Sequence, residues 1–133
     1  MYKDEQISLC KARLEKASKF VNEANQTLDL KMYEAAANRS YYAIFHSMRA
    51  VLALDGVDFK KHSGVIQYFQ KEYIKTEIFE KEYSRIIKRA FDLRVESDYE
   101  DFYIISHEDV ESQVDASIRF YQAVEEYVSK VLK

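Results

Sequence analysis

Apolar residues recur at alternating spacings of three and four along most of the chain, the pattern of amphipathic α-helices. The first stripe predicts a helix over residues 5–28, and a denser one predicts a helix over residues 32–54. In the second helix a row of small residues lies beside a row of larger apolar ones, so we expect it to be the most buried. The small residues are Ala36, Ser40, Ala43, Ser47 and Ala50.

Further stripes and capping residues predict the remaining helices. Gly56 ends the second helix, because glycine readily adopts the left-handed conformation that closes a helix. Ser63, Thr76 and Ser106 are candidate N-caps, and Ser106 begins a capping-box pattern. These signals predict a short helix over residues 63–73. They also predict two long helices, one from Thr76 to about Ser97 and one from Ser106 to the C-terminus. Residues 97–105 form the expected loop.

Composition supports a helical fold and excludes a β-sandwich or barrel. The chain has no proline, only two glycines and no Asn-Gly or Asp-Gly pair, so it lacks the residues that tight hairpins require. Its 133 residues suit one domain, which we place over residues 1–133. The predicted fold is all-α: an up-and-down antiparallel four-helix bundle with an additional short helix.

Charge and cysteine content narrow the classes of function. The formal net charge is −3, so the chain is no polycation, and any contact with RNA must be local. The single cysteine, Cys10, cannot form an internal disulfide, and the chain starts without an apolar signal segment. Its apolar stretches are shorter than the ~20 residues of a membrane span. We therefore expect a cytoplasmic protein that does not enter the membrane.

Four polar side chains interrupt the otherwise apolar second helix. They are Asn38, Arg39, Tyr42 and His46. Arg39 and His46 are seven residues apart, so they share one helix face about 10 Å apart, with Tyr42 between them. An arginine can bind a phosphate while a histidine moves a proton, as metal-free RNA cleavage through the 2′-hydroxyl requires. The alternative is a hydrogen-bond network that ties this helix to its neighbours.

Two other groups could contact an anion. Arg94 precedes Asp98 and Tyr99 where the fourth helix ends, although nearby carboxylates make a solvated face of mixed charge the alternative there. His62 follows two lysines at the start of the short helix, where backbone N–H groups attract anions or simply cap the helix. Zinc-hydrolase, P-loop and dinucleotide-binding motifs are absent, so we expect neither a metal nor a cofactor.

Residues 36–46 (AANRSYYAIFH) resemble the second-helix signature of HEPN domains, in particular their small stand-alone branch. The similarity extends to residues 61–66 (KHSGVI), to Leu93-Arg94 and to Asp98-Tyr99. The resemblance implies a helical bundle that forms a homodimer and is often encoded beside a minimal nucleotidyltransferase. Many members of the family are RNA-cleaving toxins or nucleotide-binding partners in such systems.

The ribonuclease motif of that family is an arginine followed, after four to six residues, by a histidine. Arg94 fits the arginine, but Asp98 and Tyr99 stand where the histidine is expected. Arg39 and His46 satisfy the spacing on a different helix.

The resemblance therefore implies a cleft in which Arg39 and Arg94 neutralise the phosphate and His46 moves the proton. The predicted substrate-binding residues are Asn38, Tyr42, His62, Asp98 and Tyr99. In relatives paired with a nucleotidyltransferase a nearby tyrosine can receive a nucleotidyl group, and Tyr99 and Tyr103 are similarly placed. The alternative is a non-catalytic module that binds a nucleotide or docks on the nucleotidyltransferase.

Overall fold

The computed structural model describes residues 1–99 and 106–133, with side chains described for residues 1–95 and 106–133. All regular structure in these residues is helical, which confirms the predicted fold class. The elements are α1 (Asp4–Asp29), α2 (Tyr33–Leu54), α3 (His62–Phe69), the π-helical segment η1 (Gln70–Ile74), α4 (Glu82–Tyr99) and α5 (His107–Val131).

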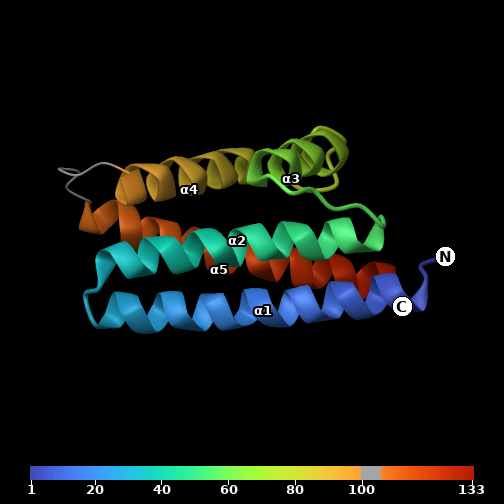
Figure 1. Cartoon of the computed structure of the whole chain (residues 1–133), viewed down its shortest axis with the longest axis horizontal. Coiled ribbons are helices and arrows are strands. Elements are labelled where there is room, and N and C mark those ends of the chain that lie inside the picture. The colour runs from blue at the N-terminus through green and yellow to red at the C-terminus, as the bar shows by residue number, and fades with distance from the viewer. Residues whose placement is uncertain (100–105) are drawn as a thin grey trace.

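The long helices α1, α2, α4 and α5 lie side by side and run alternately in opposite directions (Figure 1). Helix α2 lies between α1 on one side and α3 with α4 on the other, and α5 packs behind it (Figure 1). It is the one helix among the described residues that contacts α1, α3, α4 and α5. The predicted antiparallel bundle with a short extra helix is therefore confirmed.

The central position of α2 explains its composition. Fifteen of its 22 residues are buried, as the two apolar rows predicted. Its buried serines do not leave their hydroxyls without partners, because Ser40 donates to the Ala37 carbonyl and Ser47 to the Ala43 carbonyl. Small side chains that satisfy their own hydroxyls allow neighbouring helices to approach α2 closely.

Two of the predicted N-caps, Thr76 and Ser63, are wrong, although the short helix begins within one residue of its predicted start. The Thr76 hydroxyl donates back to the Glu72 carbonyl, and α4 begins only at Glu82, because turns and bends occupy most of the intervening segment. Helix α3 is preceded by Lys61 as its N-cap, so Ser63 lies within the first turn. The Ser106 cap is confirmed, since its side chain accepts a hydrogen bond from the Asp109 backbone N–H at 3.3 Å.

The end of α2 also agrees with the sequence. Gly56 has a φ of 71°, the left-handed conformation expected just after a helix. None of the helices in the described part of the chain has the length and apolar character needed to cross a membrane.

Candidate functional site

The predicted polar row of α2 lies along the side of the helix that meets α1. At one end, Arg39 donates from Nε to Glu23 Oε1 at 3.1 Å and from Nη1 to Asn38 Oδ1 at 2.8 Å. The Arg39 side chain remains 38% exposed. Its guanidinium therefore forms a surface ion pair with α1, and a phosphate would have to compete with Glu23 for it.

Further along the same row, His46 is packed among aromatic rings. Its imidazole lies parallel to the Phe20 ring of α1 at a centroid distance of 5.5 Å, and it also contacts Tyr42 and Phe45. Only 5% of the residue is exposed, and Nδ1 has no hydrogen-bond partner among the described residues.

The environment of His46 keeps it uncharged. Burial lowers the pKa of His46 to about 4, and the positive charges of Lys16, Arg49 and Arg13 act in the same direction. The imidazole is therefore neutral near pH 7, so it has no imidazolium proton to donate.

A second imidazole, that of His62, lies close by at the start of α3. Its Nδ1 is 2.7 Å from the Tyr41 hydroxyl oxygen, and its ring stacks on Phe45 at a centroid distance of 4.1 Å. Burial lowers the pKa of His62, and the charges of Arg94 and Arg49 lower it further. The residue is only partly buried, and because Nδ1 is taken by Tyr41, Nε2 is the ring nitrogen without a hydrogen bond among those described.

Arg94 brings a positive charge from α4 to the same place. Its guanidinium carbon lies 5.2 Å from the centre of the Tyr41 ring and 5.5 Å from that of Tyr42, within the range of cation–π attraction. Tyr41 is fully buried, and burial raises the pKa of its hydroxyl, which therefore stays protonated.

These residues form one site built from four helices, which we call the cation–aromatic cluster. It consists of Phe20, Tyr41, Tyr42, Phe45, His46, His62 and Arg94. An open hollow of about 450 Å³ adjoins it on α1, where Phe20 lies among Lys16 and Lys19 and the carboxylates Glu15 and Glu23. The cluster thus combines aromatic rings, a guanidinium cation and one partly exposed imidazole.

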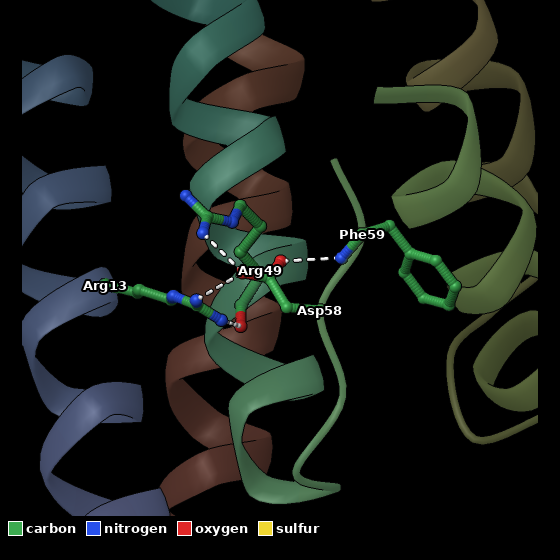
Figure 2. Close-up of polar contacts among 4 residues, drawn as sticks. All are labelled: Arg13, Arg49, Asp58 and Phe59. Carbon is green, nitrogen blue, oxygen red and sulfur yellow. Dashed lines mark hydrogen bonds and ion pairs between the residues drawn. The ribbon is translucent and has the colours of Figure 1, made fainter. Parts of the chain in front are cut away.

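An ion-pair network holds the loop that leads to His62 (Figure 2). Asp58 Oδ2 accepts from Arg13 of α1 at 3.1 Å and from Arg49 of α2 at 3.0 Å, while its Oδ1 accepts from the Phe59 backbone N–H at 2.9 Å. Arg13 also donates to the Arg49 carbonyl at 2.9 Å. We call Arg13, Arg49 and Asp58 the arginine–aspartate clamp.

The clamp leaves a net positive charge beside the cluster. Partial burial acts to raise the pKa of Asp58, but the hydrogen bonds from Arg49 and Phe59 and the charges of both arginines lower it below its usual range. Asp58 is therefore ionised, and two guanidinium groups share its single negative charge.

Metal ligands do not gather here. Across the described ranges, 1–99 and 106–133, no group of three or more His, Cys, Asp or Glu side chains is placed to hold a metal ion.

Comparison with known proteins identifies the family. Residues 10–127 match the model of the HEPN domain, which covers most of the chain. The chain belongs to the HEPN domain family. A UPF0332 protein of Thermotoga maritima is 31% identical to this HEPN domain over 113 residues, which are 85% of this chain and 86% of that protein.

Two relatives of the HEPN domain from Methanocaldococcus jannaschii are named "putative toxin". One is 38% identical over 88 residues, which are 66% of this chain and 66% of that protein. The other is 34% identical over 98 residues, which are 74% of this chain and 67% of that protein.

The HEPN fold brings together only part of the predicted site. Tyr42, His46, His62 and Arg94 meet in the cation–aromatic cluster, whereas Arg39 bonds to its neighbour Asn38 and to Glu23 of α1. Asp98 and Tyr99 lie on the last turn of α4, and their side chains fall outside the described part of the chain, as does all of Tyr103.

Sequence reasoning missed several residues that build the site of this HEPN domain. They are Arg13, Phe20, Tyr41, Phe45, Arg49 and Asp58. Tyr41 and Phe45 were signalled by their spacing of four on α2, which places both toward His62. No local pattern indicates Arg13 or Phe20, because their partners lie more than twenty residues away.

Proposed function

We propose that this HEPN domain is the toxin-like component of a two-protein system and that it cleaves RNA without a metal at the cation–aromatic cluster. The observation that carries the proposal is the position of Arg94, which lies over the Tyr41 and Tyr42 rings beside the partly exposed imidazole of His62. The names of the two archaeal relatives support a toxin-like role.

Binding of RNA uses both parts of the cluster. The Arg94 guanidinium attracts the phosphate, while the adjoining hollow on α1 has mixed charge, with Lys16 and Lys19 balanced by Glu15 and Glu23. Phe20 and Tyr42 are partly exposed, so the parts of their rings that His46 and Arg94 leave uncovered can contact unpaired bases. Single-stranded RNA is therefore the favoured substrate class.

Proton transfer falls to His62 rather than to His46. In the tautomer in which Nδ1–H donates to the Tyr41 hydroxyl oxygen, the neutral imidazole can accept the ribose 2′-hydroxyl proton at Nε2. The 2′ oxygen then bonds to phosphorus as the bond from phosphorus to the 5′ oxygen breaks, and the His62 imidazolium returns the proton from Nε2 to the 5′ oxygen. The products are a 2′,3′-cyclic phosphate and a 5′-hydroxyl end.

A cleavage assay tests these roles. Arg94→Ala and His62→Ala should each reduce the rate on a single-stranded RNA by about 10²-fold to 10⁴-fold, and a chelator should have no effect. The matched control is Arg119→Ala. It removes an exposed arginine of α5 that is not part of the cluster and pairs with Asp115. An RNA with 2′-deoxyribose at the cut site should stay intact. Cleavage that needs a divalent metal, or that survives both cluster substitutions, contradicts the proposal.

A non-catalytic nucleotide-binding or nucleotidyltransferase-docking module is the second candidate. It is favoured by the burial and low pKa of His46, and by the presence of Asp98 and Tyr99 where the family motif has histidine. Under this alternative, fluorescence anisotropy detects binding of the same RNA or of a nucleotide, Arg94→Ala weakens it, and the RNA stays uncut.

The remaining predicted residues extend the proposed site. Arg39, freed from Glu23, would neutralise a second phosphate, with Asn38 orienting its guanidinium. Asp98 and Tyr99 would contact the substrate at the end of α4, one turn beyond Arg94.

The proposed system consists of a homodimer of this chain and a minimal nucleotidyltransferase, both in the cytoplasm. Light scattering should give the mass of two copies. Co-expression with a nucleotidyltransferase encoded nearby should relieve growth arrest, and intact-mass measurement shows whether Tyr99 or Tyr103 gains a nucleotidyl group. Unrestricted growth when the chain is expressed alone contradicts the toxin-like role.

A further inference from the structure

A large open hollow of about 810 Å³ lies between α3, η1 and the start of α4, and it shares no residue with the cation–aromatic cluster. Ser84 and Arg85 are the lining residues that belong to α4, and Arg85 is nine positions before Arg94, or about 14 Å along the helix axis. The hollow is therefore a separate surface feature, which neither the RNA-cleaving nor the nucleotide-binding proposal uses.

Two departures from regular backbone geometry border this hollow. The π-helical turn η1 closes with a hydrogen bond from the Lys75 N–H to the Gln70 carbonyl at 2.8 Å. Glu77, two residues later, has a φ of 65°, a left-handed conformation that is unfavourable for a residue with a side chain. Such departures occur preferentially at functional surfaces, and here both face the same hollow.

The side chains of the hollow combine an apolar floor with a basic rim. Ile66 and Ile74 provide the floor, and the rim cations are Lys71, Lys75, Lys81 and Arg85. Within the described residues, none of these four cations takes part in an ion pair. Glu77 is the single acidic residue of the lining. An acidic partner would therefore meet unpaired positive charge on several sides.

We propose that this hollow, the basic groove, docks an acidic amphipathic segment of a partner protein. Apolar side chains of that segment would pack on the partly exposed Ile66, beneath which Ile74 is already buried, while its carboxylates pair with the rim. Nucleic acid fits less well, because the described lining of the groove contains no aromatic ring on which a base could stack. The proposal is independent of whether the cation–aromatic cluster cleaves RNA.

A peptide panel on the full chain tests the charge and the apolar face separately. The probe is a fluorescein-labelled peptide of about 18 residues, or five helical turns, with leucines on one face and glutamates elsewhere. Two control peptides are used. The first has the same composition in scrambled order, and the second has lysine in place of every glutamate. Anisotropy should show binding of the first peptide, with both controls at least about tenfold weaker.

Variants of the protein then locate the binding. The double charge reversal Lys71→Glu with Lys75→Glu should weaken the acidic peptide by at least about tenfold, as two rim pairs become repulsive. Lys11→Glu with Lys133→Glu, which reverses two exposed lysines outside the groove, should change it by less than about twofold. Ile66→Ser should weaken binding as well, with a melting curve to verify that the variant is folded.

Amide chemical shifts provide an independent map. The acidic peptide should perturb residues 66–85 and leave the start of α2 unaffected. Equal binding of the scrambled peptide, or an unchanged affinity after the Lys71/Lys75 reversal, overturns the proposal.

Two further measurements decide between this partner and other occupants. If single-stranded poly(U) binds with the same sensitivity to the Lys71/Lys75 reversal, the groove belongs to nucleic acid and the proposal fails. If the reversal instead lowers the mass found by light scattering, the groove is a contact between copies of this chain, and the proposal fails as well. The Lys71→Glu/Lys75→Glu variant should still cleave RNA at the parent rate. This result would show that the test of the groove is separate from the test of the cation–aromatic cluster.

Discussion

The two imidazoles of the cation–aromatic cluster differ in how their surroundings constrain them. His46 is enclosed by rings and has no partner at Nδ1 among the described residues, whereas His62 bonds to the Tyr41 hydroxyl and is only partly buried. Enclosure stabilises the neutral form of His46 and makes its protonation costly. His46 therefore contributes to packing, whereas His62 is the histidine to which the proposed proton transfer is assigned.

Burial of His46 predicts a specific loss of stability in acid. In the folded state its pKa is about 4, against 6.5 for an unperturbed histidine. Above pH 6.5 both states are neutral and the imidazole has no effect. As the pH falls from 6.5 toward 4, the unfolded chain binds the proton first, so up to roughly 3 kcal/mol of stability is lost.

The measurement is the free energy of unfolding in urea at pH 7 and at about pH 4.5, for the parent and for His46→Phe. The variant cannot be protonated at this position, so it should lose less stability on acidification than the parent. Carboxylates titrate in both proteins, and the difference between the two isolates the imidazole. Identical losses would show that His46 is not the source.

Sequence spacing placed Tyr42 and His46 correctly on one row but could not show their exposure. The exposure of His46 depends on Phe20, a residue of α1 brought opposite it only by helix packing. Arg39 illustrates the same limit, because its partner Glu23 lies on α1, sixteen residues away in the sequence. Helical periodicity fixes which residues share a face, while tertiary contacts decide what that face meets.

Among the secondary-structure elements, the connection from α2 to α3 depends on the arginine–aspartate clamp. Asp58 links this connection to α1 through Arg13 and to α2 through Arg49. The buried Arg13 has its guanidinium satisfied by Asp58 and by the Arg49 carbonyl. Loss of the carboxylate would leave this charge short of a partner and would loosen the segment that positions His62.

We therefore expect Asp58→Ala to lower the free energy of unfolding by about 1–3 kcal/mol. The range is below that of a fully buried pair, because the Asp58 side chain is 48% exposed. Asp115→Ala is the matched control, since this aspartate forms an exposed pair with Arg119 one turn away, and it should change stability by less than about 0.5 kcal/mol. Equal effects of the two substitutions in urea titrations would contradict a structural role for the clamp.

Helix ends were predicted well where a side chain caps the backbone and poorly where several signals compete. Ser106 caps α5 as its capping box indicated. The Thr76 hydroxyl instead bonds back to Glu72, and the π-helical turn before it shifts the next helix start to Glu82. A π-turn has no distinctive local sequence, so neither η1 nor the basic groove beside it could be derived from residue spacing.

Considered as one unit, the bundle is organised by rings that join helices distant in sequence. Phe120 of α5 is fully buried and contacts Phe69 of α3, Phe79 and Tyr83, with ring centroids 5.5, 6.3 and 5.4 Å away. The fold class and antiparallel order were predictable, because periodic stripes and short connections allow few other arrangements. These ring contacts were not, since they join residues about 40–50 positions apart.

Phe120→Ala should destabilise the whole bundle by about 3–5 kcal/mol, because it removes a buried ring and leaves a cavity between helices. Gln122→Ala, two residues away on the exposed side of α5, should stay within about 0.5 kcal/mol of the parent. The midpoint of thermal or urea unfolding checks both values. A loss below about 1 kcal/mol for Phe120→Ala would contradict the packing described here.

The position of α5 also bears on how the chain is made in the cell. This helix covers α1, α2 and α4, yet it is synthesised after all of them. During translation the apolar faces that will meet Phe120, Val124 and Val128 remain uncovered. If translation stops before α5, the fragment exposes these apolar faces and cannot form the complete bundle. Such a fragment is prone to aggregation and degradation.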